Sequence, residues 1–233
     1  MEFLQSFQLA WALLVSGDDV LYRIIGLSVQ LALAATLAGA IIGLPLGAWL
    51  AISRFPGRSA LVAALNALLG LPSVVVGLAV YLLLSRAGPL GAFGLLFTPT
   101  AIVIAQTLLV APIVAALTRQ ICEDGWSEYA ELFASLGLSR WRSLYSLLWD
   151  LRHSLLTVVL AGFGRAVSEV GAVMVVGGNI DGVTRVMTTA IALETSKGDL
   201  PRARALGLIL VALVLLMNSL ALALRQWSLA RHG

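Results

Sequence analysis

Charged side chains are scarce in this sequence. Of its 233 residues, 12% are charged and 60% are hydrophobic, whereas an ordinary soluble domain has about 25% charged residues. A soluble protein of this size could not bury so much apolar surface in one core, so lipid must solvate much of the chain. The composition therefore excludes an ordinary water-soluble domain and indicates an integral membrane protein.

Cysteine, histidine and lysine are also rare. With a single cysteine, Cys122, no intramolecular disulfide can form. The two histidines, His153 and His232, are scattered and show no metal-ligand spacing, so we predict no metal site. Lys197 is the only lysine, and dispersed arginines account for almost all of the basic residues behind the net charge of +3. This dispersal disfavours a nucleic-acid partner.

Motifs for nucleotide hydrolysis and covalent catalysis are missing. The single lysine is followed by Gly198, so no phosphate-binding P-loop occurs in these residues. Neither the G-x-S-x-G elbow nor the H-E-x-x-H helix is present. We therefore expect no enzyme activity and no cofactor in this chain. An intramembrane enzyme is disfavoured, and an ion-driven carrier would need more intramembrane acids than the single Glu169.

Five apolar stretches are each long enough to cross a bilayer. A spanning helix needs about 20 mostly apolar residues, whereas barrel strands are about 10 residues long and alternate in polarity. These stretches do not alternate, so the predicted fold is an all-α polytopic membrane helix bundle forming one transmembrane domain over residues 1–233. The predicted spans are residues 24–52, 61–84, 99–117, 155–176 and 205–224.

A shorter apolar stretch, residues 3–15, precedes the first span. It is too short to cross alone, so we predict an N-terminal interfacial helix. Glu2 stands where a signal peptide would be basic, and no A-x-A site follows, which argues against a cleavable signal.

The distribution of basic residues predicts the orientation. If five helices alternate, eight arginines fall on one side and six basic residues on the other. This bias places the N-terminus outside and the C-terminus in the cytoplasm; if residues 3–15 spanned the membrane, the N-terminus would lie inside. The predicted cytoplasmic set is Arg54, Arg58, Arg119, Arg140, Arg142, Arg152, Arg225 and Arg231, and the external set is Arg23, Arg86, Arg185, Lys197, Arg202 and Arg204.

Residues 119–154 form the largest predicted cytoplasmic segment between spans. Ser127 is placed to cap one short helix, and Gly137 stands where a glycine would end it. Ser139 is placed to cap a second helix that begins at Arg140. The second helix is rich in aromatic residues and suits the membrane surface. The segment is therefore predicted to be a helix, a turn and a helix.

Within this segment, residues 131–137 (ELFASLG) resemble the "EAA" loop of ABC importer permeases. In that family a glutamate stands six residues before a glycine, and an apolar residue follows about ten later, here Leu147. Leu132 and Phe133 replace the two alanines of the family pattern, and Trp149-Asp150 replaces its closing Leu-Pro. The resemblance implies that this loop docks on an ATP-hydrolysing subunit. The candidate coupling residues are Glu131, Leu136, Gly137, Leu138, Ser139 and Arg140.

Further segments are similar to the molybdate, sulfate and tungstate group of these permeases. They are GLPSVVVG (residues 70–77), GPL (88–90), LLFTPTA (95–101), FGRAVSEVGA (163–172) and GGNI (177–180). Two more, SEVGAV (168–173) and TRVMTTAI (184–191), look closest to the tungstate-type branch. The resemblance implies a type I ABC importer permease fold, a multi-pass position in the prokaryotic plasma membrane, and inward transport of a tetrahedral oxyanion. Tungstate is the first expectation, and molybdate and sulfate are the alternatives.

The resemblance also implies an assembly. The expected partners are a second permease copy, two copies of an ABC ATPase that bind ATP and Mg, an extracytoplasmic oxyanion-binding protein and the lipid bilayer. A symmetric pair is physically sensible, since five helices are few to enclose a pathway.

Four residues are candidates for the translocation path or for an intramembrane ion pair. Arg165 and Glu169 fall within the fourth predicted span, where each charge costs about 2.5–3.5 kcal/mol to insert. Their spacing of four would place them on one helical face. They form either a structural ion pair or a site where Arg165 also guides a passing dianion. Asn179 lies in an external turn or at the mouth of the path. Thr188 lies in an external segment that either dips toward the pore or is a surface helix.

Overall fold

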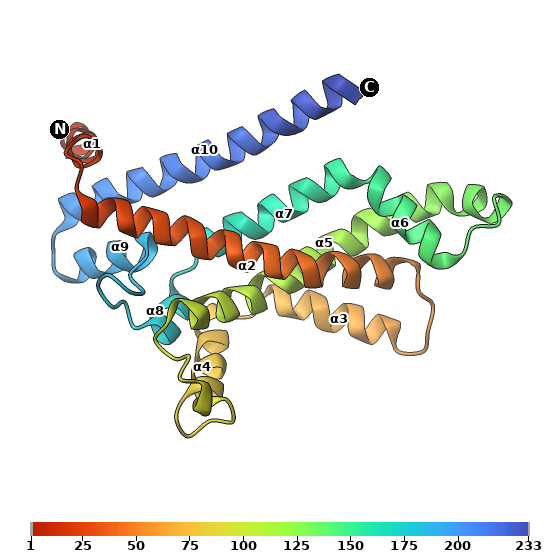
Figure 1. The fold of residues 1–233 in the computed structure, drawn as a ribbon, viewed down its shortest axis with the longest axis horizontal. Helices are drawn as coiled ribbons and strands as arrows, with labels where there is room; N and C mark the ends of the chain where they lie inside the picture. Colours follow the sequence, from red (N-terminus) through yellow and green to blue (C-terminus); the bar gives the residue numbers. More distant parts are fainter. Residues whose placement is uncertain (1, 233) are drawn as a thin grey trace. The chain divides into compact units, whose positions relative to one another are not determined.

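The computed structural model describes residues 2–232. Within that range the chain forms helices and their connections and contains no strand (Figure 1), so the predicted all-α fold is confirmed. The helices are α1 (Glu2–Val15), α2 (Asp19–Ile52), α3 (Arg58–Leu69), α4 (Ser73–Leu84), the 3₁₀ turn η1 (Gly91–Phe93), α5 (Pro99–Ser135), α6 (Arg140–Asp150), α7 (Arg152–Val167), α8 (Gly171–Gly177), α9 (Met187–Ser196) and α10 (Leu200–His232).

Three of the described helices are long and apolar enough to cross a membrane, and the number of spans rises to five if each of two interrupted pairs crosses as one. The three are α2, α5 and the Leu200–Leu220 part of α10, and the interrupted pairs are α3 with α4 and α7 with α8. The interrupted pairs coincide in sequence with the second and fourth predicted spans, and their crossing of the membrane as single spans stays a prediction. They are not the continuous helices that we predicted, because each is broken into two.

The first break follows from backbone chemistry. Gly70 follows α3 and donates its N–H to the carbonyl oxygen of Ala67 at 3.1 Å. Pro72 has no N–H to donate, and its ring disfavours the helical conformation in Leu71. One helix therefore stops at this point and the next begins at Ser73.

The chain divides into two compact units. Unit 1 comprises Met1–Ala34, Ser73–Gln106 and Val167–Gly233, and unit 2 comprises Ala35–Pro72 and Thr107–Ala166.

In unit 2, a glycine stripe on α2 packs directly on α5. A Cβ atom built on Gly39 would lie 2.7 Å from Val110, and one built on Gly43 would lie 2.7 Å from Val114 and 2.8 Å from the backbone oxygen of Ala111. Such distances leave no room for a side chain. Small residues at every fourth position allow two membrane helices to approach closely, and here they join α2 to α5.

The course of α5 corrects one prediction. We expected the third span to end at residue 117 and a separate helix to begin after Ser127, but α5 continues without a break to Ser135. Ser127 lies inside the helix, where its hydroxyl donates to the backbone oxygen of Asp124 at 2.7 Å. No proline lies between Pro112 and Ser135, so no proline forces a stop before the end of the helix.

In unit 1, α4 packs against α8, and α1 and α9 pack against α10. A Cβ atom built on Gly77 would lie 2.7 Å from the backbone of Ala172, so α4 and α8 are in close contact. On α1, Ala10 is buried in a cluster with residues of α9 and α10, whereas Phe7 and Trp11 are exposed. The predicted N-terminal helix is thus present, with an apolar outer face; its position at the membrane surface stays a prediction.

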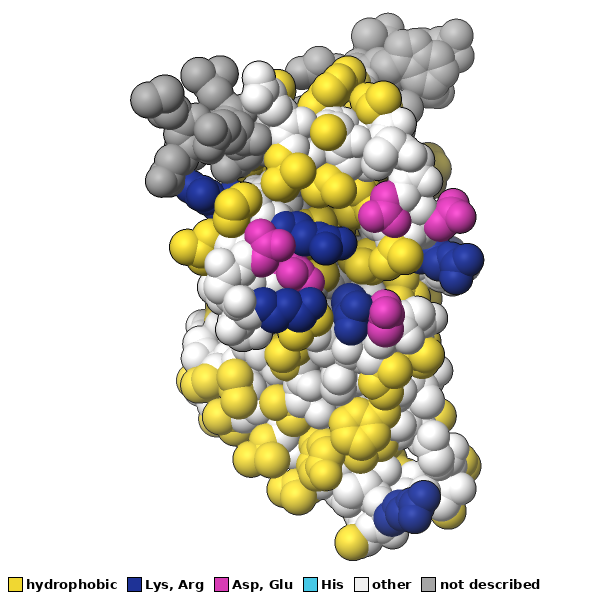
Figure 2. All heavy atoms as spheres, turned by 90° about the vertical axis from the view of Figure 1, so that its left-hand side faces the viewer, with side chains coloured by type: hydrophobic (Ala, Val, Ile, Leu, Met, Phe, Trp, Pro, Cys, Tyr) yellow, Lys and Arg dark blue, Asp and Glu magenta, His cyan; other side chains and the backbone are white. Residues whose placement is uncertain are grey.

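Charged side chains gather between hydrophobic areas on the face of the molecule drawn in Figure 2. Unit 1 contains two short ion pairs, Arg185 with Asp181 at 2.9 Å and Lys197 with Glu194 at 2.9 Å. Arg225 and Arg231 belong to the predicted cytoplasmic set, but their side chains are not among those that the structure describes.

Candidate functional site

The predicted coupling loop in unit 2 is a helix, a tight turn and a helix. Gly137 adopts the left-handed conformation with φ of +64°. Its N–H donates to Ala134 at 3.1 Å, and the N–H of Leu138 donates to Phe133 at 3.1 Å. These two bonds form a Schellman motif, the standard end of a helix at a glycine. The predicted role of Gly137 in ending the helix is confirmed. Ser139 occupies the N-cap position of α6, although its side chain makes no capping hydrogen bond.

A small apolar core supports this loop. Phe133, Leu144 and Leu147 are buried together with Ala48 of α2 and Cys122 of α5. Leu147 is 0% exposed. The core ties the turn and α6 to the ends of α2 and α5, so the loop has a fixed shape.

The outer surface of the loop carries an acid beside exposed apolar side chains. Glu131 is exposed, Leu132 is 50% exposed and Leu136 is 62% exposed. We take these exposed side chains as a candidate interaction surface. The predicted coupling residues Glu131, Leu136, Gly137, Ser139 and Arg140 are exposed, and Leu138 is half-buried.

α6 presents a second exposed stripe. Trp141, Tyr145 and Trp149 follow one another at intervals of four and are 71%, 71% and 60% exposed. The guanidinium of Arg152 lies 5.0 Å from the ring centroid of Trp149, a cation–π distance. Aromatic rings next to arginine suit the boundary between lipid and water.

In unit 1, the connection between α7 and α8 brings two predicted site residues together. Glu169 is 3% exposed, and its carboxylate accepts the N–H of Ala172 at 3.0 Å. Its backbone carbonyl accepts the hydroxyl of Thr188 at 2.8 Å. Thr188 is 5% exposed. The first turn of α9 is therefore buried, whereas Thr195 and Ser196 at its end are exposed. The choice between a segment that dips toward the pore and a surface helix stays a prediction.

The structure places Arg165 in the last turn of α7, which ends at Val167. The helical spacing that we assumed between Arg165 and Glu169 does not hold, because the helix stops before Glu169. The predicted pairing of the two side chains stays a prediction.

The connection from α8 to α9 is a tightly bonded turn that contains Asn179. Asn179 has a positive φ of 50°, and its Oδ1 atom is buried without a hydrogen-bond partner. The hydroxyl of Thr184 donates to the carbonyl of Gly177 at 2.6 Å and accepts the N–H of Ile180 at 2.9 Å. The predicted turn at Asn179 is present, and its role in a path stays a prediction.

Sequence reasoning missed two polar features. One is Thr184, which is fully buried and fastens the turn, and which no local pattern singles out. The other is Glu123, which forms ion pairs with both Arg58 and Arg119 in unit 2. The spacing of four between Arg119 and Glu123 is a helical-pair signal that could have identified half of this cluster. Arg58 lies 65 residues from Glu123, so no local signal exists for that pair.

Comparison with known proteins identifies the family. Residues 43–231 match the family described as the inner membrane component of binding-protein-dependent transport systems. The tungstate uptake system permease protein TupB of Peptoclostridium acidaminophilum is 43% identical over 227 residues, which cover 97% of this chain and 100% of that protein. TupB of Campylobacter jejuni is 42% identical over 158 residues, 68% of this chain and 66% of that protein. The sulfate transport system permease protein CysT of Escherichia coli is 29% identical over 226 residues, 92% of this chain and 80% of that protein.

These matches confirm the resemblance to ABC importer permeases and the greater similarity to the tungstate-type branch than to the sulfate type. The family match covers most of the chain, and its description agrees with helices that are long and apolar enough to cross a membrane. The protein is thus a multi-pass protein of the plasma membrane. The chain belongs to the family of inner membrane components of binding-protein-dependent transport systems.

Proposed function

We propose that this chain is the pore-forming permease subunit of an ATP-driven importer that carries tungstate into the cell. The observation that carries the proposal is the 43% identity to a tungstate uptake permease over 97% of the chain. The similarity covers the connections between the helices as well as the spans.

The surface of the coupling loop supports an ATPase partner. Glu131, Leu132 and Leu136 offer an acid and two exposed apolar side chains on one structured end of α5. A partner groove that accepted this end would bury both leucines and fix the acid by a charge-assisted hydrogen bond. The Schellman turn and the core beneath it keep the loop in one shape, so movement of a docked ATPase is passed to the helices.

The transport step needs no covalent chemistry from this chain. ATP and Mg bind to the partner ATPases, whose closure shifts the docked loops and with them the balance between outward and inward openings. Two permease copies, two ATPases and an extracytoplasmic anion-binding protein complete the proposed assembly. We place three residues along the translocation path or among the residues that hold its shape: Arg165, Glu169 and Asn179.

Sulfate and molybdate are the second candidates, because a sulfate permease is 29% identical over 92% of the chain and a putative molybdenum permease is 29% identical over 74% of it. All three substrates are tetrahedral dianions, and the binding protein is proposed to make most of the choice between them.

Elemental analysis of cells that lack this protein tests the proposal. At low external tungstate, the deletion should lower the tungsten content of the cells and leave sulfate uptake nearly unchanged. The gene supplied on a plasmid should restore the tungsten content. A loss of sulfate uptake with normal tungsten content would assign the chain to sulfate transport instead. Steady tungstate transport by the purified chain alone in vesicles, with no ATPase, would overturn the ATP-driven mechanism.

A further inference from the structure

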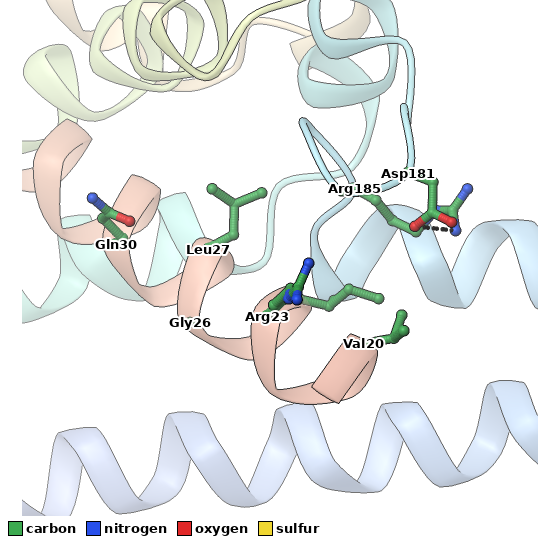
Figure 3. A pocket seen from close by; sticks show the side chains of 9 residues that line it. Val20, Arg23, Gly26, Leu27, Gln30, Asp181 and Arg185 are labelled. Atoms are coloured by element: carbon green, nitrogen blue, oxygen red, sulfur yellow. Dashed lines mark ion pairs between the residues drawn. The ribbon is translucent and has the colours of Figure 1, made fainter. Parts of the chain in front are cut away.

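A pocket of about 610 Å³ lies within unit 1, between the first turns of α2 and the connection that precedes α9. Six of its lining residues come from positions 20–30 of α2 and three from positions 181–185. Figure 3 shows Arg23, Leu27 and Gln30 along α2, with Asp181 and Arg185 across the pocket from them. Its volume falls within the range of small-molecule sites, about 300–1,000 Å³.

The polar lining favours an anion. Arg23 and Arg185 supply two positive charges and Asp181 one negative charge, which leaves one positive charge in excess. Arg23 makes no ion pair within the described part of the chain. Gln30 adds amide donors that carry no charge. A planar guanidinium presents paired N–H donors that match the oxygens of an oxyanion.

Arg185 still has capacity to bind an anion although it is paired with Asp181. One terminal nitrogen contacts Asp181 at 2.9 Å, but the Nε atom is buried and has no hydrogen-bond partner. The side chain of Asp181 is 67% exposed, so water weakens its hold on the arginine. An oxyanion in the pocket would give the buried N–H an acceptor, which a buried donor strongly requires.

The wall that carries Arg185 is fixed before any anion arrives. The carbonyl of Ile180 accepts the N–H groups of Thr184 and Arg185, both at 3.0 Å. The buried hydroxyl of Thr184 bonds to both Gly177 and Ile180, so the turn is closed from inside. A prearranged cationic group binds an anion at a lower cost in ordering than a mobile one.

We propose that this pocket is an external receiving site for the transported oxyanion, with Arg23 and Arg185 supplying charge and Gln30 supplying neutral donors. The proposal rests on the proposed function and adds to it the place where the anion first meets the permease. Both arginines belong to the basic residues that the sequence places on the external side. An acidic side chain of the binding protein is the competing occupant, and the experiments separate the two.

Direct binding is the first test. Sodium tungstate is dialysed to equilibrium against the purified full chain in lipid nanodiscs, and bound tungsten is measured by elemental analysis. We expect saturable binding that Arg23→Gln weakens about tenfold and Arg23→Lys weakens less, because a cation at this position attracts the anion. Arg86→Gln, which removes an exposed arginine of the same predicted side outside the pocket, should leave binding unchanged. Equal affinities of Arg23→Gln and Arg86→Gln would overturn the proposal, as would the absence of saturable binding to the wild type.

Thiol labelling gives a second readout that does not require removal of an arginine. The only native cysteine, Cys122, is 0% exposed, so a membrane-impermeant thiol reagent should react mainly with an introduced cysteine. Tungstate alone should slow labelling of Val20→Cys, which lines the pocket, and should not affect Ala87→Cys, which does not. Protection of Val20→Cys by the binding protein without anion, and none by tungstate, would assign the pocket to protein docking and overturn the proposal.

Uptake by cells distinguishes failure of this site from failure of the proposed function. If wild-type cells take up tungstate and Arg23→Gln cells do so with the same KM, the receiving site is wrong and the proposed function stands. If wild-type cells show no uptake of tungstate that depends on this protein, the proposed function itself is wrong.

Discussion

The hydroxyl of Thr188 donates a hydrogen bond to the backbone carbonyl of Glu169 at 2.8 Å, across 19 residues of sequence. The bond joins the first turn of α9 to the break between α7 and α8. Both residues are buried, at 5% and 3% exposure, so water does not replace the bond if it is lost. The connection that interrupts the predicted fourth span is therefore held in place by a helix far along the chain.

Replacing Thr188 with valine should destabilise the protein and impair uptake. Valine keeps the shape of the side chain but leaves the buried carbonyl of Glu169 without this donor, a loss of about 1–3 kcal/mol. Thermal unfolding of the purified variant and tungstate uptake by cells measure the two effects. Thr195→Val is the matched control on the same helix, because the exposed hydroxyl of Thr195 bonds only to Ile191. Equal unfolding midpoints for the two variants would contradict the role given to Thr188.

The substitution Gly43→Ala should weaken the packing of α2 on α5. Its methyl group would lie 2.7 Å from Val114 and 2.8 Å from the backbone of Ala111, so the helices must separate. Overpacking of this kind costs about 1–3 kcal/mol. Gly207→Ala is the control, since no atom lies within 4 Å of the added methyl group. The thermal midpoint of Gly43→Ala should fall, whereas that of Gly207→Ala should stay level or rise, because alanine favours a helix more than glycine does. A midpoint lower for Gly207→Ala than for Gly43→Ala would contradict the packing.

The turn of the coupling loop can be tested by backbone conformation alone. Gly137 has φ of +64°, a conformation that costs an ordinary L-residue about 1–2 kcal/mol. Gly137→Leu should therefore reduce both co-purification with the ATPase and uptake, whereas Gly137→Asn should retain more of both because asparagine tolerates this conformation. Equal losses of co-purification and uptake in the two variants would mean that the size of the side chain at residue 137 matters, and not its backbone conformation.

Glu131→Ala should uncouple the complex without unfolding it. Glu131 is exposed, so its loss should leave the thermal midpoint nearly unchanged while uptake falls. Glu128→Ala removes another exposed acid of α5 one turn earlier and is the control for charge. Wild-type co-purification and uptake in Glu131→Ala would show that the contact with the ATPase lies elsewhere.

The double change Arg165→Met with Glu169→Gln separates the two roles predicted for Arg165. Glutamine retains an oxygen for the N–H of Ala172, which Glu169 bonds in the protein. We expect the double variant to assemble and to take up tungstate, as a purely structural ion pair requires. Normal assembly with no uptake would instead assign to Arg165 a part in guiding the anion.

Features with local causes could be predicted from the sequence. The left-handed end of the coupling helix follows from a glycine after an apolar, helix-forming run, and Gly137 was placed correctly. The five apolar stretches marked the regions of the spans. The break at Gly70 and Pro72 contains the two residues that most often end a helix, although length and hydropathy alone made it look continuous.

Features with distant causes could not be predicted in this way. The break at residues 168–170 contains neither glycine nor proline, and one of its anchors is Thr188. The ion pair between Arg58 and Glu123 joins α3 to α5, and no sequence pattern near either residue predicts it. Ser127 illustrates the opposite error. A serine before acidic residues is typical of a helix start, but continuous helix on both sides outweighed that local preference.

The unbroken course of α5 beyond Pro112 has a mechanical consequence. The 23 residues from Ile113 to Ser135 form a helical segment about 34 Å long that contains no proline kink. An uninterrupted helix of this length resists bending, because a bend would strain many of its backbone hydrogen bonds at once. We therefore expect any bending of the chain to occur at the interrupted segments, residues 70–72 and 168–170, rather than within this part of α5.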